Sequence, residues 1–282
     1  MKVLIVGGNS NLGGVLKNTL KDYFEIISAG RKNCDWFIDL NDPNDKIIFP
    51  EGIDAVIHCA AHFGGLSDTE MFEAENVNVL GTLKLCQAAV RYRVKHFVFI
   101  SSIFTQATEN SRKQNIYSIS KRHAEELAAF YMSQQTIAFT ILRPSQFYGD
   151  ADAYRVHQPF FYDILDKAEK NEEVVFYGSN DARRNFIHVE DVASIILKVI
   201  QTKTSGTFDC QQVNDVLYSE IANAAIVAFS SSSIVLFDHS KPDIPDNISS
   251  IDISLYKAID YYPLINIREG IKRVATHRKK CS

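Results

Sequence analysis

The stretch VLIVGGNSNLGG, residues 3–14, joins a short apolar run to a glycine-rich turn. A continuous apolar run of this length is typical of a parallel strand that is buried on both faces. From Leu12 to Asp22 the apolar residues recur at spacings of three and four, as in a helix that covers a sheet. A strand, a glycine-rich turn and a helix in this order are the usual phosphate-binding element of an open parallel sheet.

The residues of the turn have distinct physical uses. Gly7 lets the chain turn sharply after the strand, and Gly13 lets the helix pack close to it. The helix N-terminus then offers N–H groups and a positive dipole to a pyrophosphate. Ser10 stands where a glycine is usual, and its hydroxyl is expected to donate to a phosphate oxygen. A plain tight turn is the alternative. The predicted cofactor contacts of this loop are Gly7, Asn9, Ser10, Asn11, Leu12 and Gly13.

Further strand patterns alternate with helical ones through the first half of the chain, which predicts β-α-β units on a parallel sheet. We therefore expect an α/β fold, a Rossmann-type doubly wound parallel sheet. After Pro144 the pattern loosens, which indicates a smaller lobe. The expected strands are KVLIVGG, FEIISAG, DAVIHCAA, HFVFISS, AFTILRP, EVVFYG, GTFDCQ and SIVLFD. The expected helices include 77–92, 160–171, 189–202 and 219–229.

The composition of the 282 residues limits the class of protein. Hydrophobic residues make up 46% and charged residues 23%, which argues against long disorder and against a membrane span. The formal net charge of −4 gives no electrostatic reason to expect a nucleic-acid partner. Five scattered cysteines without a C-x-x-C pair argue against a disulfide framework. We expect a cytoplasmic protein without a secretory signal, and no metal site, because no His, Cys and Asp residues have metal-ligand spacing.

The end of the second expected strand bears on the choice of cofactor. An acidic residue there usually binds the ribose 2′-hydroxyl of NAD(H), whereas arginine accommodates the 2′-phosphate of NADP(H). The strand FEIISAG is followed by Arg31 and Lys32. Two cations favour NADP(H), although NAD(H) remains open because both side chains also suit a solvated loop.

A second group of residues suits proton transfer. Tyr117 and Lys121 are four residues apart in an expected helix and therefore lie on one face. An ammonium beside a phenol favours the phenolate and brings the pKa of the phenol toward the neutral range. Ser102 ends a strand and is expected to face the same cleft, where its hydroxyl would hydrogen-bond a carbonyl or alcohol. With a bound nicotinamide, these groups form a carbonyl–alcohol redox site.

With these motifs in place, the chain resembles an extended short-chain dehydrogenase/reductase of the NAD-dependent epimerase/dehydratase family. The resemblance implies that Tyr117 is the catalytic acid/base, that Lys121 lowers its pKa and holds the nicotinamide ribose, and that Ser102 binds the reacting oxygen. It extends the cofactor site and places a nucleotide-diphosphate sugar near Gln146 and Arg184. The further implied cofactor contacts are Asp39, Leu40, Ala60, Ala61 and Pro144. The motifs that carry the resemblance are the glycine loop, DAVIHCAA, NVLGT, FVFISS, the Tyr117/Lys121 pair, LRPSQFYG and RRNFIHVEDVA.

The resemblance also implies a domain division and an assembly. It predicts a dinucleotide-binding domain of residues 1–145 that also receives about 187–210, and a discontinuous substrate lobe of residues 146–186 and 211–282. Relatives commonly form homodimers through the helix that bears the tyrosine. An apolar stripe on that helix suits either a homodimer or inward packing, and consists of Ala124, Leu127, Ala128 and Tyr131.

The chain departs from the family pattern at several positions. Besides Ser10, Gln146 replaces a common asparagine and Asn185 replaces the usual aspartate. The segment from Ser102 to Tyr117 is shorter than in many sugar epimerases and lacks V-Y-G. Because this segment would border the sugar, its shortening leaves the substrate class open.

These features favour an NADPH-dependent 4-ketoreductase acting on a nucleotide-diphospho-4-keto-6-deoxysugar. A 4-epimerase or a dehydratase would use the same three residues with tightly held NAD. The absence of an Asp-Glu pair after Ser102 argues against the dehydratase. A non-catalytic protein that senses NADP(H) is a further alternative, because a fold does not fix a function.

Overall fold

The computed structural model describes residues 1–42, 46–107, 115–247 and 250–281. These residues form two compact units, each built from separated segments of the chain. The first unit comprises Met1–Pro144, Ala193–Cys210 and Ser254–Tyr261. The second unit comprises Ser145–Val192, Gln211–Ile253 and Tyr262–Ser282.

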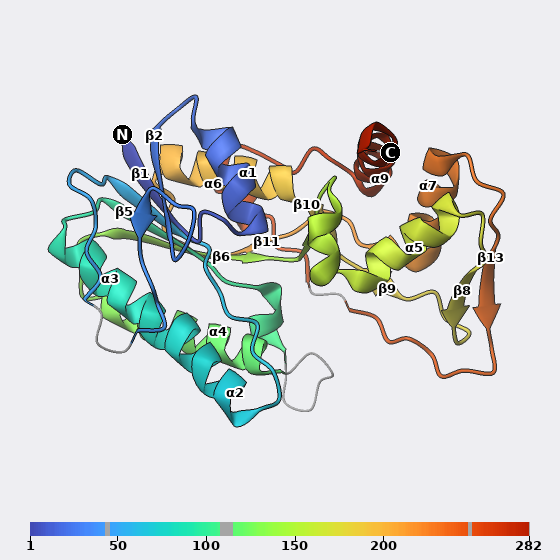
Figure 1. The fold of residues 1–282 in the computed structure, drawn as a ribbon, viewed down its shortest axis with the longest axis horizontal. Coiled ribbons are helices and arrows are strands. Elements are labelled where there is room, and N and C mark those ends of the chain that lie inside the picture. The colour runs from blue at the N-terminus through green and yellow to red at the C-terminus, as the bar shows by residue number, and fades with distance from the viewer. Residues whose placement is uncertain (43–45, 108–114, 248–249, 282) are drawn as a thin grey trace. The chain divides into compact units, whose positions relative to one another are not determined.

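The first unit is organised around a parallel sheet whose order, among the described residues, is β11-β6-β5-β4-β1-β2-β3 (Figure 1). The chain builds outward from β1 to β3 and then returns to β4 on the other side of β1, which confirms the predicted Rossmann-type, doubly wound fold. The strands are β1 (Lys2–Val6), β2 (Glu25–Gly30), β3 (Trp36–Phe37), β4 (Ala55–His58), β5 (His96–Ile100), β6 (Ala138–Pro144) and β11 (Gly206–Cys210).

Helices cover both faces of this sheet, with α1 and α6 on one face and α3 and α4 on the other (Figure 1). The central strands are consequently buried, as their unbroken apolar runs predict; every residue of β4 and β5 is buried. The principal helices are α1 (Asn11–Leu20), α3 (Gly81–Arg91), α4 (Ile116–Met132) and α6 (Val189–Thr202). Shorter elements are α2 (Asp68–Glu75), the π-helix η1 (Asn76–Leu80), the 3-10 helix η2 (Ile103–Gln106) and α8 (Ser254–Ile259).

The second unit consists of short strand pairs and helices. Its helix α7 packs against α5 and α9. The helices are η3 (Asp152–Val156), α5 (Pro159–Glu169), α7 (Tyr218–Phe229) and α9 (Ile267–Cys281). The strand pairs are β7 (Gln146–Tyr148) with β10 (Phe186–His188), β8 (Val174–Tyr177) with β13 (Val235–Asp238), and β9 (Arg183–Arg184) with β12 (Val216–Leu217).

This division differs from the predicted one in three places. Ser145 groups with the second unit. Residues 187–192 group with the second unit, because β10 pairs with β7. Residues 254–261 group with the first, because α8 contacts β11.

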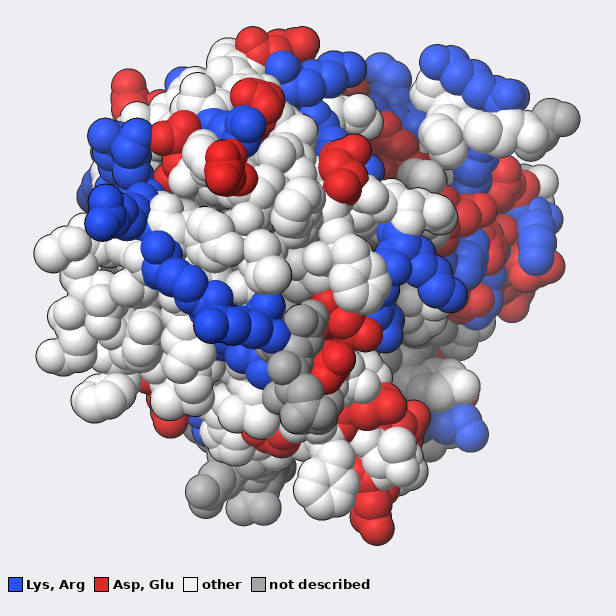
Figure 2. Space-filling view, turned by 60° about the vertical axis from the view of Figure 1, so that its left-hand side comes forward, with Lys and Arg blue, Asp and Glu red and all other residues white. Residues whose placement is uncertain are grey.

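No helix within the described ranges is both long and apolar enough to span a bilayer. Figure 2 shows acidic and basic side chains together on one face of the molecule.

The predicted apolar stripe on α4 packs inward. Ala124 and Ala128 are buried, and Leu127 and Tyr131 pack against the core cluster under the sheet. The stripe therefore fits the inward-packing alternative, and a homodimer remains a prediction that would need another surface.

The contact between α1 and the end of β1 is made by backbone atoms. A Cβ added to Gly13 would lie 2.3 Å from the carbonyl oxygen of Gly7 and 2.9 Å from the Gly8 carbonyl carbon. Any side chain at Gly13 would therefore push the helix away from the strand turn. The neighbouring Gly14 has open space at the same position, with no atom within 4 Å.

We expect Gly13→Ala to destabilise the protein by about 2 kcal/mol, because its methyl group meets immovable backbone. Differential scanning calorimetry should show a lower melting temperature. The matched variant Gly14→Ala should raise the melting temperature, because alanine favours the helix over glycine by roughly 1 kcal/mol. Equal effects of the two substitutions would contradict the close contact.

Candidate functional site

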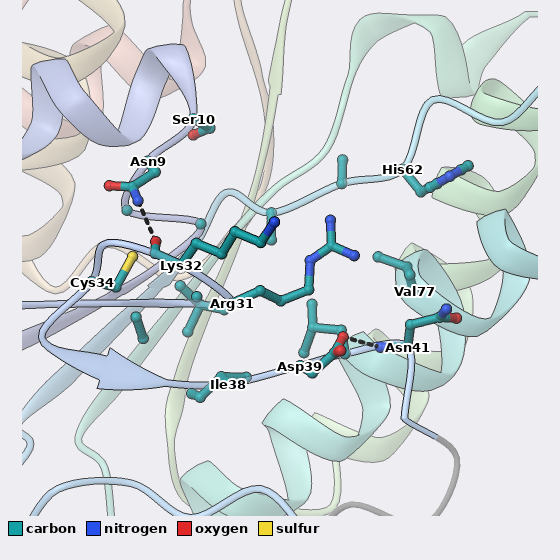
Figure 3. Close-up of a pocket in the computed structure, with 18 of the residues that line it drawn as sticks. Asn9, Ser10, Arg31, Lys32, Cys34, Ile38, Asp39, Asn41, His62 and Val77 are labelled. Atoms are coloured by element: carbon teal, nitrogen blue, oxygen red, sulfur yellow. Dashed lines mark hydrogen bonds between the residues drawn. The ribbon is translucent and has the colours of Figure 1, made fainter.

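A cavity of about 560 Å³ opens in the first unit where β1, β2 and β4 end. Its walls are the glycine turn, the turn after β2 and the segment after β4 (Figure 3). The predicted cofactor contacts that line it are Gly7, Asn9, Ser10, Arg31, Lys32, Asp39, Leu40, Ala60 and Ala61. The structure thus gathers residues from separate segments at the carboxyl edge of the sheet, where ligands of this fold bind.

The glycine turn requires its first glycine. Gly7 has a φ of +89°, and a Cβ there would lie 2.5 Å from the backbone nitrogen of Ala60. The turn therefore passes directly against the main chain after β4. This contact joins two of the predicted cofactor segments at one wall of the cavity.

Ser10 has a structural use that accounts for its place in the loop. Its side chain caps α1 by accepting a hydrogen bond from the Gly13 N–H at 3.0 Å. The same hydroxyl lies 3.6 Å from the Cys59 sulfur. A hydroxyl has one proton, so where Ser10 is the donor to Cys59, the predicted hydrogen bond to a phosphate competes with that contact.

Arg31 and Lys32 are exposed, and both side chains extend from the turn after β2 across the cavity (Figure 3). A carboxylate also lines this cavity, that of Asp39, which accepts from the Asn41 N–H at 3.0 Å. Asp39, Arg31 and Lys32 therefore line the same cavity. The tip of the turn after β2 carries the two cations and no carboxylate. Lining residues that the sequence reasoning did not identify include Cys34, Ile38, Asn41, His62, Glu73 and Val77.

Helix α4 presents the proposed proton-transfer residues. It begins after Asn115, whose side chain forms a reciprocal capping box with Ser118. Tyr117 and Lys121 follow one helical turn apart. Lys121 is 1% exposed, and its Nζ donates to the Ile100 carbonyl at 2.9 Å and lies 4.7 Å from the centre of the Phe99 ring. The lysine is thus directed at the end of β5, two residues before Ser102.

The pKa values follow from burial. Loss of solvent raises the pKa of Tyr117 to about 12, and a hydrogen bond with Ser102 offsets part of this rise. Burial lowers the pKa of Lys121 to about 8, against the opposing effects of Cys59 and Glu125. Ser102 is thus near enough to Tyr117 to lower the pKa of its phenol. The expectation that Lys121 lowers the pKa of Tyr117 stays a prediction.

The turn that follows Ser102 is held by a buried polar network. Thr105 donates through Oγ1 to the Ser102 carbonyl at 2.9 Å and to Glu125 at 3.2 Å. Glu125, 4% exposed, accepts from the Arg143 Nε at 3.0 Å. These residues come from η2, α4 and β6, so they fix the strand end that carries Ser102. Residues 108–114 of the shortened segment lie outside the described part of the chain.

Phe63 covers one face of Tyr117, with ring centres 4.8 Å apart and planes at 16°. The loop that carries it is held by Asn78, which accepts from the His62 N–H at 2.8 Å and donates to the His62 carbonyl at 2.7 Å. Sequence reasoning noted Asn78 only as part of NVLGT. It missed Phe63, for which the sequence carries no signal.

The predicted substrate contacts, Gln146 and Arg184, belong to the second unit. Gln146 donates to the Gln158 side chain at 2.9 Å. The buried Arg184 donates from Nη1 to the carbonyls of Arg183 at 2.7 Å and Pro245 at 2.9 Å. Its guanidinium also lies 4.7 Å from the centre of the Tyr218 ring.

Other residues of the motifs that the sequence singles out are buried or hydrogen-bonded within the protein. Asn185, which replaces the usual aspartate, donates to the Gln212 carbonyl and to Asp215, both at 2.9 Å. Pro144 ends β6 and is buried. The buried His58 hydrogen-bonds Thr82 at 2.9 Å. Within the described residues, no three His, Cys, Asp or Glu side chains form a group that could hold a metal ion.

The sequence model of the NAD dependent epimerase/dehydratase family matches residues 3–210. The chain is 26% identical over 159 residues to the CDP-abequose synthase of Salmonella typhimurium, covering 56% of this chain and 52% of that protein. It therefore spans about half the length of this relative. It is 25% identical over 307 residues to a putative UDP-glucose 4-epimerase of Methanocaldococcus jannaschii, covering 98% of both chains.

Solved structures share the fold over the full length. MoeE5 in complex with UDP-glucose and NAD superposes with a TM-score of 0.78 at 20% identity, covering 100% of both chains. RMD from Pseudomonas aeruginosa complexed with NADPH superposes with a TM-score of 0.78 at 19% identity, covering 100% of this chain and 99% of that one. These neighbours thus bind NAD or NADPH. With the family match over residues 3–210, the chain belongs to the NAD-dependent epimerase/dehydratase family.

Proposed function

We propose that the protein is an NADPH-dependent reductase of a nucleotide-diphospho-4-keto-6-deoxysugar. The observation that carries this proposal is the joint placement of Arg31 and Lys32 across the cavity, in the same unit as Ser102 and Tyr117. A sugar-nucleotide substrate is supported by the names of the relatives, CDP-abequose synthase and UDP-glucose 4-epimerase. Gln146 and Arg184 remain its predicted contacts in the second unit.

The residues of the cavity fit a dinucleotide. The glycine turn brings backbone close to the ligand space, and the N-terminus of α1 is a favourable place for a pyrophosphate. Arg31 and Lys32 supply the positive charge that a 2′-phosphate needs. When bound, NADPH supplies the hydride for the reduction.

The chain's own residues would bind the substrate carbonyl oxygen and supply its proton. Ser102 would donate a hydrogen bond to the substrate carbonyl oxygen. As that oxygen gains negative charge, Tyr117 would transfer its phenolic proton to it and become a phenolate. The ammonium of Lys121 would stabilise this phenolate. A phenol whose pKa is about 12 is protonated at neutral pH, which suits the role of an acid in the reductive direction.

A second candidate function is a nucleotide-sugar 4-epimerase. The match to a putative UDP-glucose 4-epimerase over 98% of both chains favours it. An epimerase oxidises and re-reduces its substrate on one cofactor, so it interconverts sugars without consuming external NADPH. Consumption of one NADPH per product distinguishes the reductase from it.

We expect Tyr117→Phe to lower kcat by roughly 10²–10⁴-fold, because phenylalanine keeps the ring that stacks on Phe63 but has no proton to transfer. NADPH oxidation with the keto-sugar measures this, and fluorescence measures cofactor binding, which should be unchanged. Tyr131→Phe on the same helix is the control and should retain full activity. Undiminished turnover in Tyr117→Phe would exclude the phenol as the acid. Absence of turnover by the wild type with any sugar nucleotide would favour the NADP(H)-sensing alternative.

Reductive kcat is expected to be level at low pH and to fall above about pH 8. Lys121 has its pKa lowered to about 8, so its ammonium is present below that pH and is lost above it, while Tyr117 stays protonated. Because Glu125 raises the pKa of Lys121, Glu125→Gln should move the fall to lower pH. Initial rates from pH 6 to 10 provide the measurement. A level profile throughout that range would show that the charge of Lys121 is not needed.

Arg31→Ala should weaken NADPH binding by about tenfold and leave NADH binding unchanged, because the guanidinium would meet only the 2′-phosphate. Quenching of protein fluorescence by each cofactor gives the two dissociation constants. Lys21→Ala, which removes an exposed cation at the end of α1, is the control. A wild type that prefers NADH, with no change in Arg31→Ala, would overturn the NADPH assignment.

A further inference from the structure

The side chain of Asn9 is turned toward the strand turn after β2. Its amide nitrogen donates to the Lys32 carbonyl (Figure 3). It also donates to the Asn33 carbonyl at 3.0 Å. Both acceptors lie at the tip of the turn that carries Arg31 and Lys32. A side chain from the glycine loop thus connects the expected pyrophosphate end of the cavity with its two cations.

The turn has a left-handed residue at its tip. Asn33 has a φ of +50°, a conformation that asparagine adopts more readily than most residues other than glycine. The far end of the turn is fixed by Asp35, whose carboxylate accepts from the Ser28 N–H at 2.8 Å and from the Ser28 hydroxyl at 2.7 Å. Asn9 supplies the hydrogen bonds at the tip, to the Lys32 and Asn33 carbonyls. The turn is therefore held at its tip and at its far end, and Arg31 and Lys32 lie just before and at the tip.

The placement of the two cations follows from this support. Arg31 and Lys32 are exposed, long side chains, which in a free turn would sample many rotamers in water. Fixing the Lys32 and Asn33 carbonyls fixes the backbone from which both side chains leave. The turn then loses less conformational entropy when a 2′-phosphate binds, because its backbone is already held in place.

We propose that Asn9 is a positioning residue that sets the preference for a 2′-phosphorylated cofactor by holding the Arg31–Lys32 turn against the glycine loop. The inference rests on the proposed NADP(H) function and deepens it. It assigns the Asn9 side chain to selectivity between cofactors, whereas a glycine-loop residue is expected to serve the pyrophosphate common to NAD(H) and NADP(H).

The test compares two fragments that differ in the 2′-phosphate, adenosine 2′,5′-bisphosphate and 5′-AMP, by isothermal titration calorimetry. In Asn9→Ala the affinity for the bisphosphate should fall about fivefold, the effect of one net hydrogen bond, while 5′-AMP binds as before. Asn18→Ala, an exposed asparagine of α1, is the matched control and should leave both affinities unchanged. In the Arg31→Ala background the loss caused by Asn9→Ala should shrink, because the two residues act on one contact.

Three outcomes would overturn the proposal, and they differ in what else they exclude. If the wild type binds both fragments equally, the NADP(H) proposal fails and the role of Asn9 fails with it. If the wild type prefers the bisphosphate and Asn9→Ala keeps that preference, only the role of Asn9 fails. If Asn9→Ala weakens both fragments equally, Asn9 serves the loop in general and not selectivity. Retained binding of 5′-AMP shows at the same time that the variant is folded.

Discussion

The close approach of α1 to the end of β1 is the constraint on which the rest of the first unit depends. Gly7 and Gly13 allow backbone atoms to meet where any side chain would separate them. The approach fixes where the N-terminus of α1 begins and leaves Ser10 to cap it. It also places Asn9 within hydrogen-bond reach of the β2 turn. One backbone contact therefore determines both the cavity wall and the position of the cations opposite.

The proton-transfer residues raise a separate electrostatic question. Burial disfavours charge at both Tyr117 and Lys121, so it raises the pKa of the phenol and lowers that of the ammonium. Both shifts favour the neutral forms and oppose formation of a phenolate beside an ammonium. This arrangement suits an enzyme that starts from a protonated phenol, as in reduction, better than one that starts from a phenolate. Ser102 lowers the pKa of Tyr117 and Glu125 raises that of Lys121, so both partly offset the effect of burial.

Much of the fold could be predicted from the sequence because buried parallel strands leave unbroken apolar runs, and the five strands expected in the first half are present as β1, β2, β4, β5 and β6. The glycine turn and the Tyr117/Lys121 spacing were likewise visible, since both are local patterns. The Thr105–Glu125–Arg143 network was not, because its members come from three elements and no spacing links them. The hydrogen bonds from Asn9 to the turn after β2 were not predictable either, because the two segments are more than twenty residues apart and no spacing links them. The apolar stripe on α4 was ambiguous because a buried helix face and an interface have the same composition.

The family match covers the two units unequally. The match ends at residue 210 and so covers the cavity, Ser102, Tyr117 and Lys121, whereas residues 211–253 and 262–282 of the second unit lie beyond it. Arg184 lies within the matched range, but it is held by the Pro245 carbonyl and packs on Tyr218, both of which lie outside. The surroundings of the predicted diphosphate contact are thus set partly by residues beyond the family match. Family membership therefore bears more directly on the cavity of the first unit than on this predicted contact.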